Sequence, residues 1–341
     1  MAGVSGGALA AAASNEGGFG YIAAGGFLLL ILLTCSYTAR SGYRTPESLS
    51  HELYLAKELL QRQDPITKLP IGIGYFGWEL DKDFPKAIQM LQIALTSNVQ
   101  SIWLSFGNDL RPYVEFIRKT DTTRGPHGWK TLIAIQVSSS AEALTAVNEL
   151  KADIVIVQGT APSHYINRCY KPLIGNESGG HGSSKGVAVR SLLAEVLAAL
   201  PLSHPPILAA GGLGSGHDLG EIITTHGADG AVMGTRFLAT TESLYPEAKK
   251  TRLCEAKADE TVRSLAFDLA RGTTDWPNDI DGRGLKNKSV EDYDTGVDAQ
   301  RLRAAYDQAL ATRDLDRLEV WAGTGIGHTT KISSTKVSFG L

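Results

Sequence analysis

The chain is poor in cysteine and carries little net charge, and both shortages argue against whole classes of function. Its 341 residues include three cysteines, Cys35, Cys169 and Cys254, and no two of them form a Cys-x-x-Cys pair. This spacing disfavours a disulfide framework or a zinc site and favours a reducing compartment, so we expect a cytoplasmic protein without a metal. The formal net charge of -3 gives no electrostatic basis for binding nucleic acid or an anionic membrane.

The chain also has no apolar run that is long enough to cross a bilayer. Its most apolar segment covers residues 23–37, but the uninterrupted core at residues 27–33 is far shorter than the ~20 residues that a spanning helix needs. No basic region precedes the segment, which disfavours a secretory signal peptide. We therefore expect no membrane span, with an anchor at residues 23–37 as the weaker alternative.

Several catalytic signatures are missing as well. The sequence contains no His-Glu-x-x-His and no P-loop lysine motif, which argues against the metalloproteases and P-loop nucleotidases that use them. The run Gly212-Leu213-Gly214-Ser215-Gly216 has the wrong spacing for a dinucleotide fingerprint and lies late in the chain.

What the chain does contain is a regular alternation of apolar runs and helical segments. The apolar runs predict strands at residues 20–24, 69–74, 101–105, 131–137, 153–158, 206–210 and 228–233. The segments between them predict helices, and the best signalled begins at Thr45, a good N-cap that Pro46 follows. Such alternation indicates parallel strands joined by crossover helices.

These elements predict an α/β fold, a TIM (β/α)8 barrel that lacks strand 1. The predicted strands number seven, and an Ala-rich helix at residues 6–13 precedes the first of them. In a barrel this helix follows strand 1, so strand 1 is expected just before Met1, where it is absent. An open doubly wound sheet, which needs no eighth strand, is the alternative.

The chain changes character after the last predicted strand, which suggests a C-terminal helical cap. Residues 253–271 and 296–313 predict helices, and the Gly- and Asp-rich stretch at residues 272–296 predicts an extended excursion. We therefore divide the chain into a barrel core at 1–243, a cap at 244–322, and a return segment with a divergent tail at 323–341.

Two glycine turns point to a bound phosphate. Gly211-Gly212 ends one predicted strand and Gly234-Thr235 ends the next. Glycine lets backbone N–H groups approach an anion closely, and the loops after strands 7 and 8 of such barrels commonly hold a phosphate. We therefore expect a phosphorylated cofactor or substrate, although tight-turn geometry alone could also require these glycines.

One histidine stands out as a candidate for proton transfer. His181 lies among glycines in the run Gly179-Gly180-His181-Gly182, downstream of Gln158, which ends a predicted strand. A ring with so little side-chain packing of its own can face a ligand, and the ordinary pKa of histidine suits proton transfer near neutrality. A solvent-exposed loop histidine is the alternative.

The motifs taken together resemble the nitronate monooxygenase family, formerly the 2-nitropropane dioxygenases, and its fungal-like branch in particular. The resemblance rests on the segments MAGVSGGALAAAASNEGGFGYIAAG, IGIGYFGW, IVQG, GGHG, ILAAGGLGSG, GADGAVMGTRFLATTES, LAFDLARGTT and VWAGTGIG. It implies an FMN-dependent TIM barrel that oxidises alkyl nitronates and nitroalkanes with O2. By motif position, His181 would be the catalytic base, and the cofactor would be held by Met1, Ala2, Gln158, Gly180, Gly211, Gly212, Gly234 and Thr235. Gly323-Thr324-Gly325 resembles a late family motif near the flavin.

The chain departs from the family pattern in two internal segments and at both ends. Residues 27–44 and 161–177 are interpreted as insertions, and residues 328–341 leave the pattern. Two other functions stay open at this point. An inosine-monophosphate-dehydrogenase-like barrel would need an active-site cysteine, for which Cys169 and Cys254 are poorly placed. An inactive barrel could instead act as a binding protein, because a missing strand would expose sheet edges.

Overall fold

The parallel sheet predicted from the sequence is the centre of the molecule. The computed structural model describes residues 4–24, 45–62, 67–124, 129–160 and 178–339. Its main sheet has the order β1-β2-β3-β4-β5-β7-β8, with every neighbouring pair parallel. The strands are β1 (Gly20–Ala23), β2 (Leu69–Phe76), β3 (Val99–Ser105), β4 (Leu132–Val137), β5 (Ile154–Gln158), β7 (Ile207–Ala210) and β8 (Gly230–Val232). All seven predicted strands are confirmed.

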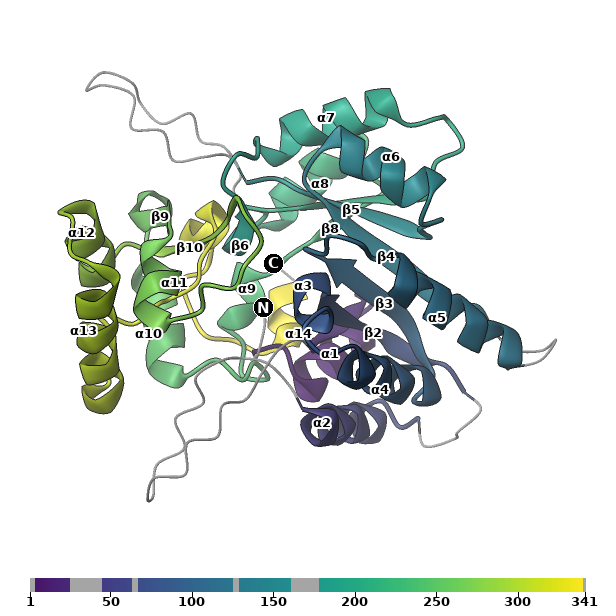
Figure 1. Cartoon of the computed structure of the whole chain (residues 1–341), viewed down its shortest axis with the longest axis horizontal. Coiled ribbons are helices and arrows are strands. Elements are labelled where there is room, and N and C mark those ends of the chain that lie inside the picture. Colours follow the sequence, from purple (N-terminus) through teal and green to yellow (C-terminus); the bar gives the residue numbers. More distant parts are fainter. Residues whose placement is uncertain (1–3, 25–44, 63–66, 125–128, 161–177, 340–341) are drawn as a thin grey trace.

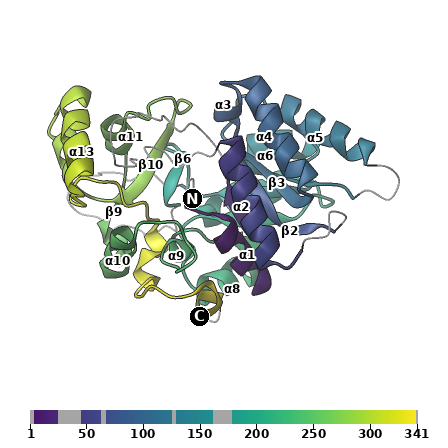
Figure 2. The ribbon, with the colours of Figure 1, turned by 90° about the horizontal axis from the view of Figure 1, so that it is seen from below.

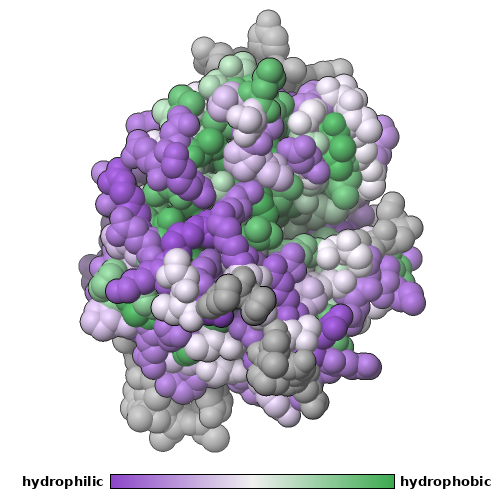
Figure 3. All heavy atoms as spheres, turned by 90° about the vertical axis from the view of Figure 1, so that its right-hand side faces the viewer, coloured by the Kyte–Doolittle hydropathy of each residue, from purple (hydrophilic) through white to green (hydrophobic). Residues whose placement is uncertain are grey.

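Helices cover the outer face of this curled sheet (Figure 1). They are α1 (Gly7–Asn15), α2 (Pro46–Leu59), α4 (Phe84–Thr96), α5 (Arg111–Thr123), α6 (Ser140–Asn148), α7 (Val189–Ala199) and α8 (Gly216–Thr224), with α3 (Gly77–Leu80) following β2. The Thr45 cap is confirmed, since its Oγ1 accepts a 3.2 Å hydrogen bond from Ser48 N. The molecular face on the right of Figure 1 mixes hydrophilic and hydrophobic side chains (Figure 3).

Alternation along the strands builds the two sides of the sheet. On β4 and β5, Ile133, Ile135 and Val155 are fully or almost fully buried in the large cluster beneath the helices. Their neighbours Ala134 and Ile156 belong to a smaller cluster on the opposite, inner side. Because successive side chains of a strand point to opposite faces, this pattern is the signature of a barrel wall buried on both sides.

The sheet curls into part of a barrel, and β1 and β8 are its two ends within the described residues. The outer edge of β1 is bonded to the segment before α1, because Ala23 N donates to Ser5 O at 3.0 Å. On the other side of the same segment, Leu244 N donates to Val4 O at 3.0 Å. Val4 and Ser5 therefore connect the β1 edge to the chain that follows β8.

A second, smaller sheet stands beside the barrel and belongs largely to the cap. It is antiparallel, with the order β6-β10-β9, and consists of β6 (Gly180–Ser183), β9 (Thr261–Ser264) and β10 (Ile280–Leu285). Helices α10 (Glu247–Glu255), α11 (Ala266–Arg271), α12 (Lys288–Asp294) and α13 (Ala299–Thr312) surround it. Figure 2 shows this lobe on the opposite side of the molecule from α2, α4 and α5.

The sequence-based reading of the cap is partly wrong. Residues 253–271 do not form one helix, since the short 3-10 turn Ala258–Glu260 and strand β9 lie between α10 and α11. The excursion at residues 272–296 contains β10 and α12, and the run around His181 is a strand rather than a loop. The strands β6, β9 and β10 pair with partners distant in sequence, so local patterns carry no sign of them. The helix expected at residues 296–313 is confirmed as α13.

The two proposed insertions at 27–44 and 161–177 fall outside the described residues, as do Cys35 and Cys169. Among the helices that the structure describes, none is long and apolar enough to cross a membrane. The apolar segment at residues 23–37 lies almost entirely outside the description.

Candidate functional site

The two glycine turns lie at the carboxyl ends of β7 and β8, as the sequence predicts. Gly211 and Gly212 have φ values of +120° and +69°, in the region that favours glycine. A Cβ on Gly211 would lie 2.7 Å from Gly159 O. The backbone requires glycine here, because any side chain would collide with the end of β5.

The late motif around Gly323 packs onto both turns. Gly323 N donates a 3.0 Å hydrogen bond to Thr235 Oγ1, on the second turn. A Cβ on Gly325 would lie 2.4 Å from Gly212 O, on the first turn. Segments 88 and 113 residues apart along the chain are thus brought into contact, and residues 323–325 form one wall of the candidate anion site.

Backbone donors at the turns are available to an anion. Within the described part of the chain, the N–H groups of Gly212, Gly234 and Thr235 donate no hydrogen bond. The N-terminus of α8 is different, because Gly214 N and Ser215 N both donate to Asp218 Oδ2, at 3.0 and 2.9 Å. Burial alone would raise the pKa of Asp218, but these hydrogen bonds outweigh it and lower the pKa below 3.8. The Asp218 carboxylate therefore already caps α8, which leaves the two turns themselves as the anion donors.

His181 is held on β6 by an aspartate and an indole. Its Nε2 lies 3.0 Å from both carboxylate oxygens of Asp268, on α11. Its ring stacks on Trp276, with 3.7 Å between ring centroids and 10° between the planes. The side chain of His181 is 11% exposed and that of Asp268 4%. The alternative of a solvent-exposed loop histidine is therefore wrong.

These surroundings keep the imidazole neutral. Burial lowers the pKa of His181 below its ordinary value of 6.5. Asp268 acts in the opposite direction, while the positive charges of Arg271 and Arg263 reinforce the effect of burial. A neutral imidazole near pH 7 is the form that can accept a proton.

An arginine from β9 locks β6 to the rest of the small sheet. The Arg263 side chain is 2% exposed, and its Nη1 lies 2.7 Å from Asp281 Oδ1 and donates to Gly182 O at 3.2 Å. Its Nη2 donates to Ser178 O at 3.2 Å. Burial raises the pKa of Asp281 despite this pairing. The pair therefore fixes the position of β6 at a cost in desolvation.

Gln158 joins the barrel to β6. Its Nε2 donates to Ser178 Oγ at 3.0 Å and to His181 O at 3.2 Å, while its Oε1 accepts from Gln136 Nε2 at 2.9 Å. The residue that ends β5 thus touches the strand of the candidate base. The structure brings Gln158, His181 and the first glycine turn into one region; Gly180, at φ +72°, belongs to the same strand.

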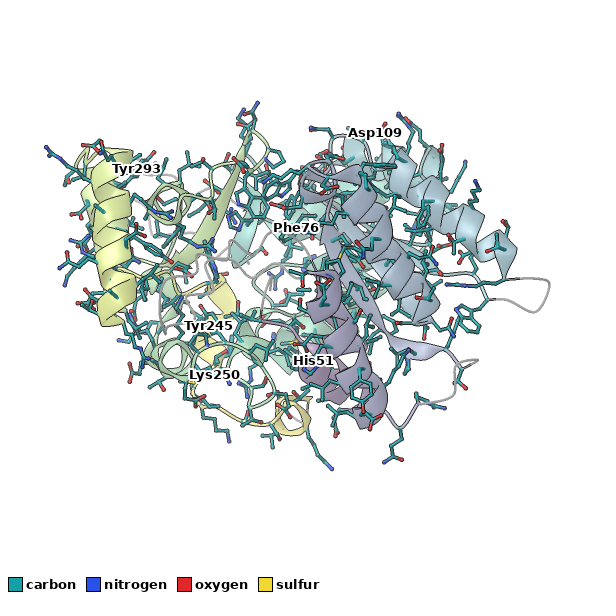
Figure 4. The ribbon with its side chains drawn as sticks, turned by 60° about the horizontal axis from the view of Figure 1, so that its bottom comes forward. His51, Phe76, Asp109, Tyr245, Lys250 and Tyr293 are labelled. Atoms are coloured by element: carbon teal, nitrogen blue, oxygen red, sulfur yellow. The ribbon has the colours of Figure 1, made fainter. Side chains whose placement is uncertain are left out.

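Aromatic side chains cover this region from both the barrel and the cap. Trp276 lies 5.1 Å from Phe76 and 4.9 Å from Trp78, between ring centroids, and Trp321 lies 5.1 Å from His181. Figure 4 shows Phe76 at the end of β2, on the side of the barrel that faces the cap. The aromatic cover shields His181 from water.

Two features leave room and donors for a planar ligand with polar edges. A Cβ added to Gly74, on the inner side of β2, would meet no atom within 4 Å, and the same holds for Gly180. The Nε1 atoms of Trp103 and Trp276 are buried without a hydrogen-bond partner. The residues present therefore fit a ring system that lies across the barrel mouth and accepts hydrogen bonds.

The sequence reading missed two residues that contact His181, namely Asp268 and Trp276. Asp268 lies in the family-like segment LAFDLARGTT, but nothing local distinguishes it from a helix-surface acid. Trp276 is the one aromatic residue of the stretch 272–279, which is a signal that could have singled it out. Met1 and Ala2 fall outside the described residues.

A metal and a cysteine nucleophile have weaker support. His217, Asp218 and Glu221 have ligand atoms within 4.8 Å of one another, but Asp218 caps α8 and Glu221 pairs with Arg190 at 2.6 Å. Burial raises the pKa of the Cys254 thiol above 9.0, which disfavours the thiolate that a nucleophile needs.

Comparison with known proteins points mainly to nitronate monooxygenases. A model of the nitronate monooxygenase family matches residues 172–337. The chain is 28% identical over 315 residues to nitronate monooxygenase npaC of Metarhizium robertsii, which covers 86% of this chain and 79% of that protein. It is 28% identical over 338 residues to a nitronate monooxygenase of Neurospora crassa, covering 95% and 81%. The solved structure of FabK from Thermotoga maritima resembles it in fold, with a TM-score of 0.67, 22% identity, and coverage of 100% of this chain and 88% of that one. Residues 172–337 thus match the nitronate monooxygenase family, and the chain is similar over most of its length to two fungal proteins of that name.

Proposed function

We propose that this protein is an FMN-dependent oxidoreductase that oxidises alkyl nitronates and nitroalkanes with O2. The observation that carries the proposal is that a buried His181, whose pKa burial lowers, lies at the same end of the sheet as two glycine turns whose backbone N–H groups have no hydrogen-bond partner among the described residues. Gln158 and Ser178 link the strand of His181 to the region of the first turn through hydrogen bonds of 3.0 to 3.2 Å. The match of residues 172–337 to the nitronate monooxygenase family model supports the same activity.

FMN is proposed rather than FAD because the site offers donors for one phosphate. Gly211, Gly212, Gly234 and Thr235 would hold that phosphate, and the chain has no dinucleotide fingerprint for a pyrophosphate. Gln158 and Gly180, with Met1 and Ala2 from the first loop, would line the ring. When bound, FMN would take electrons from the substrate and pass them to O2.

His181 would act on neutral nitroalkanes by removing the proton from the carbon beside the nitro group. The C–H bond breaks, its electron pair moves into the nitro group, and the proton forms an N–H bond on the imidazole. Asp268 would stabilise the resulting positive charge at a distance of 3.0 Å. A nitronate supplied as the anion has already lost this proton, so it needs the histidine less.

The remaining assignments follow from the same proposal. The partners would be a small nitro compound and O2, in the cytoplasm. We retain the division into a core at 1–243, a cap at 244–322 and a return segment at 323–341 as a proposal. One strand crosses this division, because β6 pairs with β10 of the cap.

The test is the identity of the cofactor and the reaction that it supports. Protein purified from an expression host should absorb near 450 nm, and acid should release FMN in about a 1:1 ratio to protein. Oxygen uptake with ethyl nitronate should require that flavin. Stoichiometric FAD would contradict the cofactor assignment, and a colourless protein that binds inosine monophosphate would favour the dehydrogenase-like alternative.

A further inference from the structure

The two ring nitrogens of His181 have different surroundings. Nε2 faces both oxygens of Asp268 at 3.0 Å. Nδ1 makes no hydrogen bond within the described part of the chain. An ionised carboxylate can only accept hydrogen bonds, so a neutral imidazole in this arrangement carries its proton on Nε2. The lone pair of Nδ1 is then free to accept another proton.

The Asp268 side chain is itself held in place, so it can determine which nitrogen of the His181 ring carries the proton. Thr273 Oγ1 donates to Asp268 Oδ1 at 2.7 Å. The backbone of Asp268 belongs to α11, where its N–H donates to Leu265 O at 3.1 Å and its carbonyl accepts from Thr273 N at 3.0 Å. The side chain is 4% exposed, so water does not compete for it.

The ring cannot easily turn over to exchange its two nitrogens. Trp276 stacks on it at 3.7 Å, and Trp321 lies 5.1 Å away at an angle of 55°. A 180° rotation about the bond to the ring would require the stacked indole to move away. Packing and hydrogen bonding therefore favour the same single orientation.

We propose that Asp268 is a positioning residue that holds His181 as the Nε2–H tautomer, so that Nδ1 is the atom that takes the substrate's proton. The inference rests on the proposed function for the identity of that substrate. The tautomer itself depends only on residues of this chain and can be measured without any substrate.

The other charged groups near the His181 ring influence its protonation by electrostatic interaction over a distance, and none of them is hydrogen-bonded to the ring. Arg271 lies on α11 with Asp268, Arg263 on β9 and Asp281 on β10. Both arginines oppose protonation of His181, and Asp268 favours it. Removal of the Asp268 charge should therefore lower the pKa of His181 further.

Nitrogen-15 NMR of the histidine side chains tests the tautomer directly. Protein labelled at the imidazole nitrogens is compared with His181→Asn, which identifies the His181 signals. We expect a protonated Nε2 and an unprotonated Nδ1 in the wild type at pH 7.5. In Asp268→Asn this pattern should change to a mixture or to protonated Nδ1. Asp279→Asn is the matched control, because Asp279 is an exposed acid of the same lobe that pairs with Lys185. A wild-type Nδ1–H form, or an unchanged pattern in Asp268→Asn, would overturn the inference.

The pH profile of turnover supplies a readout that a merely structural role would not move. For Asp268→Asn we expect kcat/KM with neutral nitroethane to fall by roughly 10- to 100-fold, the scale seen when a group that orients a functional histidine is lost. The acid limb of the variant's pH profile of kcat/KM with nitroethane should move to lower pH. Its turnover of ethyl nitronate should change much less. Equal losses with both substrates and an unmoved acid limb would contradict the role. If the wild type oxidises neither compound, the proposed function fails, and the NMR result still decides the tautomer.

Discussion

The two sheets of this protein contribute different kinds of groups to the candidate site. The seven-stranded parallel sheet offers backbone: glycine turns at the ends of β7 and β8 expose N–H groups, and its side chains are mostly buried apolar residues. The three-stranded antiparallel sheet offers side chains: His181 on β6, Arg263 on β9 and Asp281 on β10. Under the proposed function, cofactor binding and proton transfer would depend on separate structural units, which are joined at Gln158 and Ser178. Substitutions should therefore be able to disable one function and spare the other.

The largest expected effect is loss of the cofactor through a negative charge on the parallel sheet. Gly234→Asp would place a carboxylate beside the N–H groups that we assign to the phosphate, and two like charges about 4 Å apart repel by ~1–4 kcal/mol near a protein surface. The flavin content after purification should fall to below a tenth of the wild-type value, with His181 untouched.

The control for this variant is Gly220→Asp, which adds the same charge. Gly220 lies on the exposed side of α8, where a new Cβ would meet no atom within 4 Å. Its flavin content should equal that of the wild type. Full flavin retention by Gly234→Asp would show that the second turn does not hold the phosphate.

The next effect is on the stability of the antiparallel sheet. Arg263→Met would leave the Asp281 carboxylate and three carbonyl groups without their buried partner. Breaking such a pair typically costs about 3–5 kcal/mol. We expect the free energy of unfolding in urea to drop by this amount.

Arg252→Met serves as its matched control, because Arg252 pairs with Glu260 in a partly exposed bridge. Surface bridges of this kind contribute roughly 0–1 kcal/mol, so this variant should unfold close to the wild type. Similar losses in both variants would argue that the buried pair has no special role in holding β6.

A smaller effect is expected from the indole that covers the base. Trp276→Phe keeps an aromatic ring over His181 but removes the Nε1–H, which is buried without a partner. If this donor serves a nitro oxygen, its loss should lower kcat/KM by about 3- to 10-fold, the worth of one hydrogen bond of ~1 kcal/mol.

Trp129→Phe controls for the change of side chain, because its Nε1 is also buried without a partner and its ring lies over Arg124, away from His181. This variant should turn over like the wild type. An unchanged kcat/KM in Trp276→Phe would limit Trp276 to packing.

The comparison also explains what could be predicted from the sequence. The strands of the parallel sheet are local apolar runs, each followed by its own helix, so their positions and the glycine turns could be read directly. The strand β6 has four residues, two of them glycine, and pairs with residues about 100 positions later. No local pattern announces such a strand, and the same holds for β9 within the helix expected at 253–271.

The residues of the candidate site also differ in whether the sequence could predict them. His181 could be selected from its glycine neighbours and from the family motif. Asp268 could not, because its role arises only when α11 packs against β6 and brings its carboxylate within 3.0 Å of Nε2. The partner of a catalytic group is set by tertiary packing, whereas the group itself can have a local signature.

The most direct test of the account compares two substrates on one variant. His181→Asn should retain its flavin, since the glycine turns are unchanged. Its oxygen uptake with neutral nitroethane should fall by roughly 100-fold or more, the scale of a lost general base. With ethyl nitronate, which needs no deprotonation, the fall should be much smaller, and His217→Asn on the exposed surface of α8 should match the wild type with both. Equal losses with the two substrates would contradict the assignment of His181 as the base.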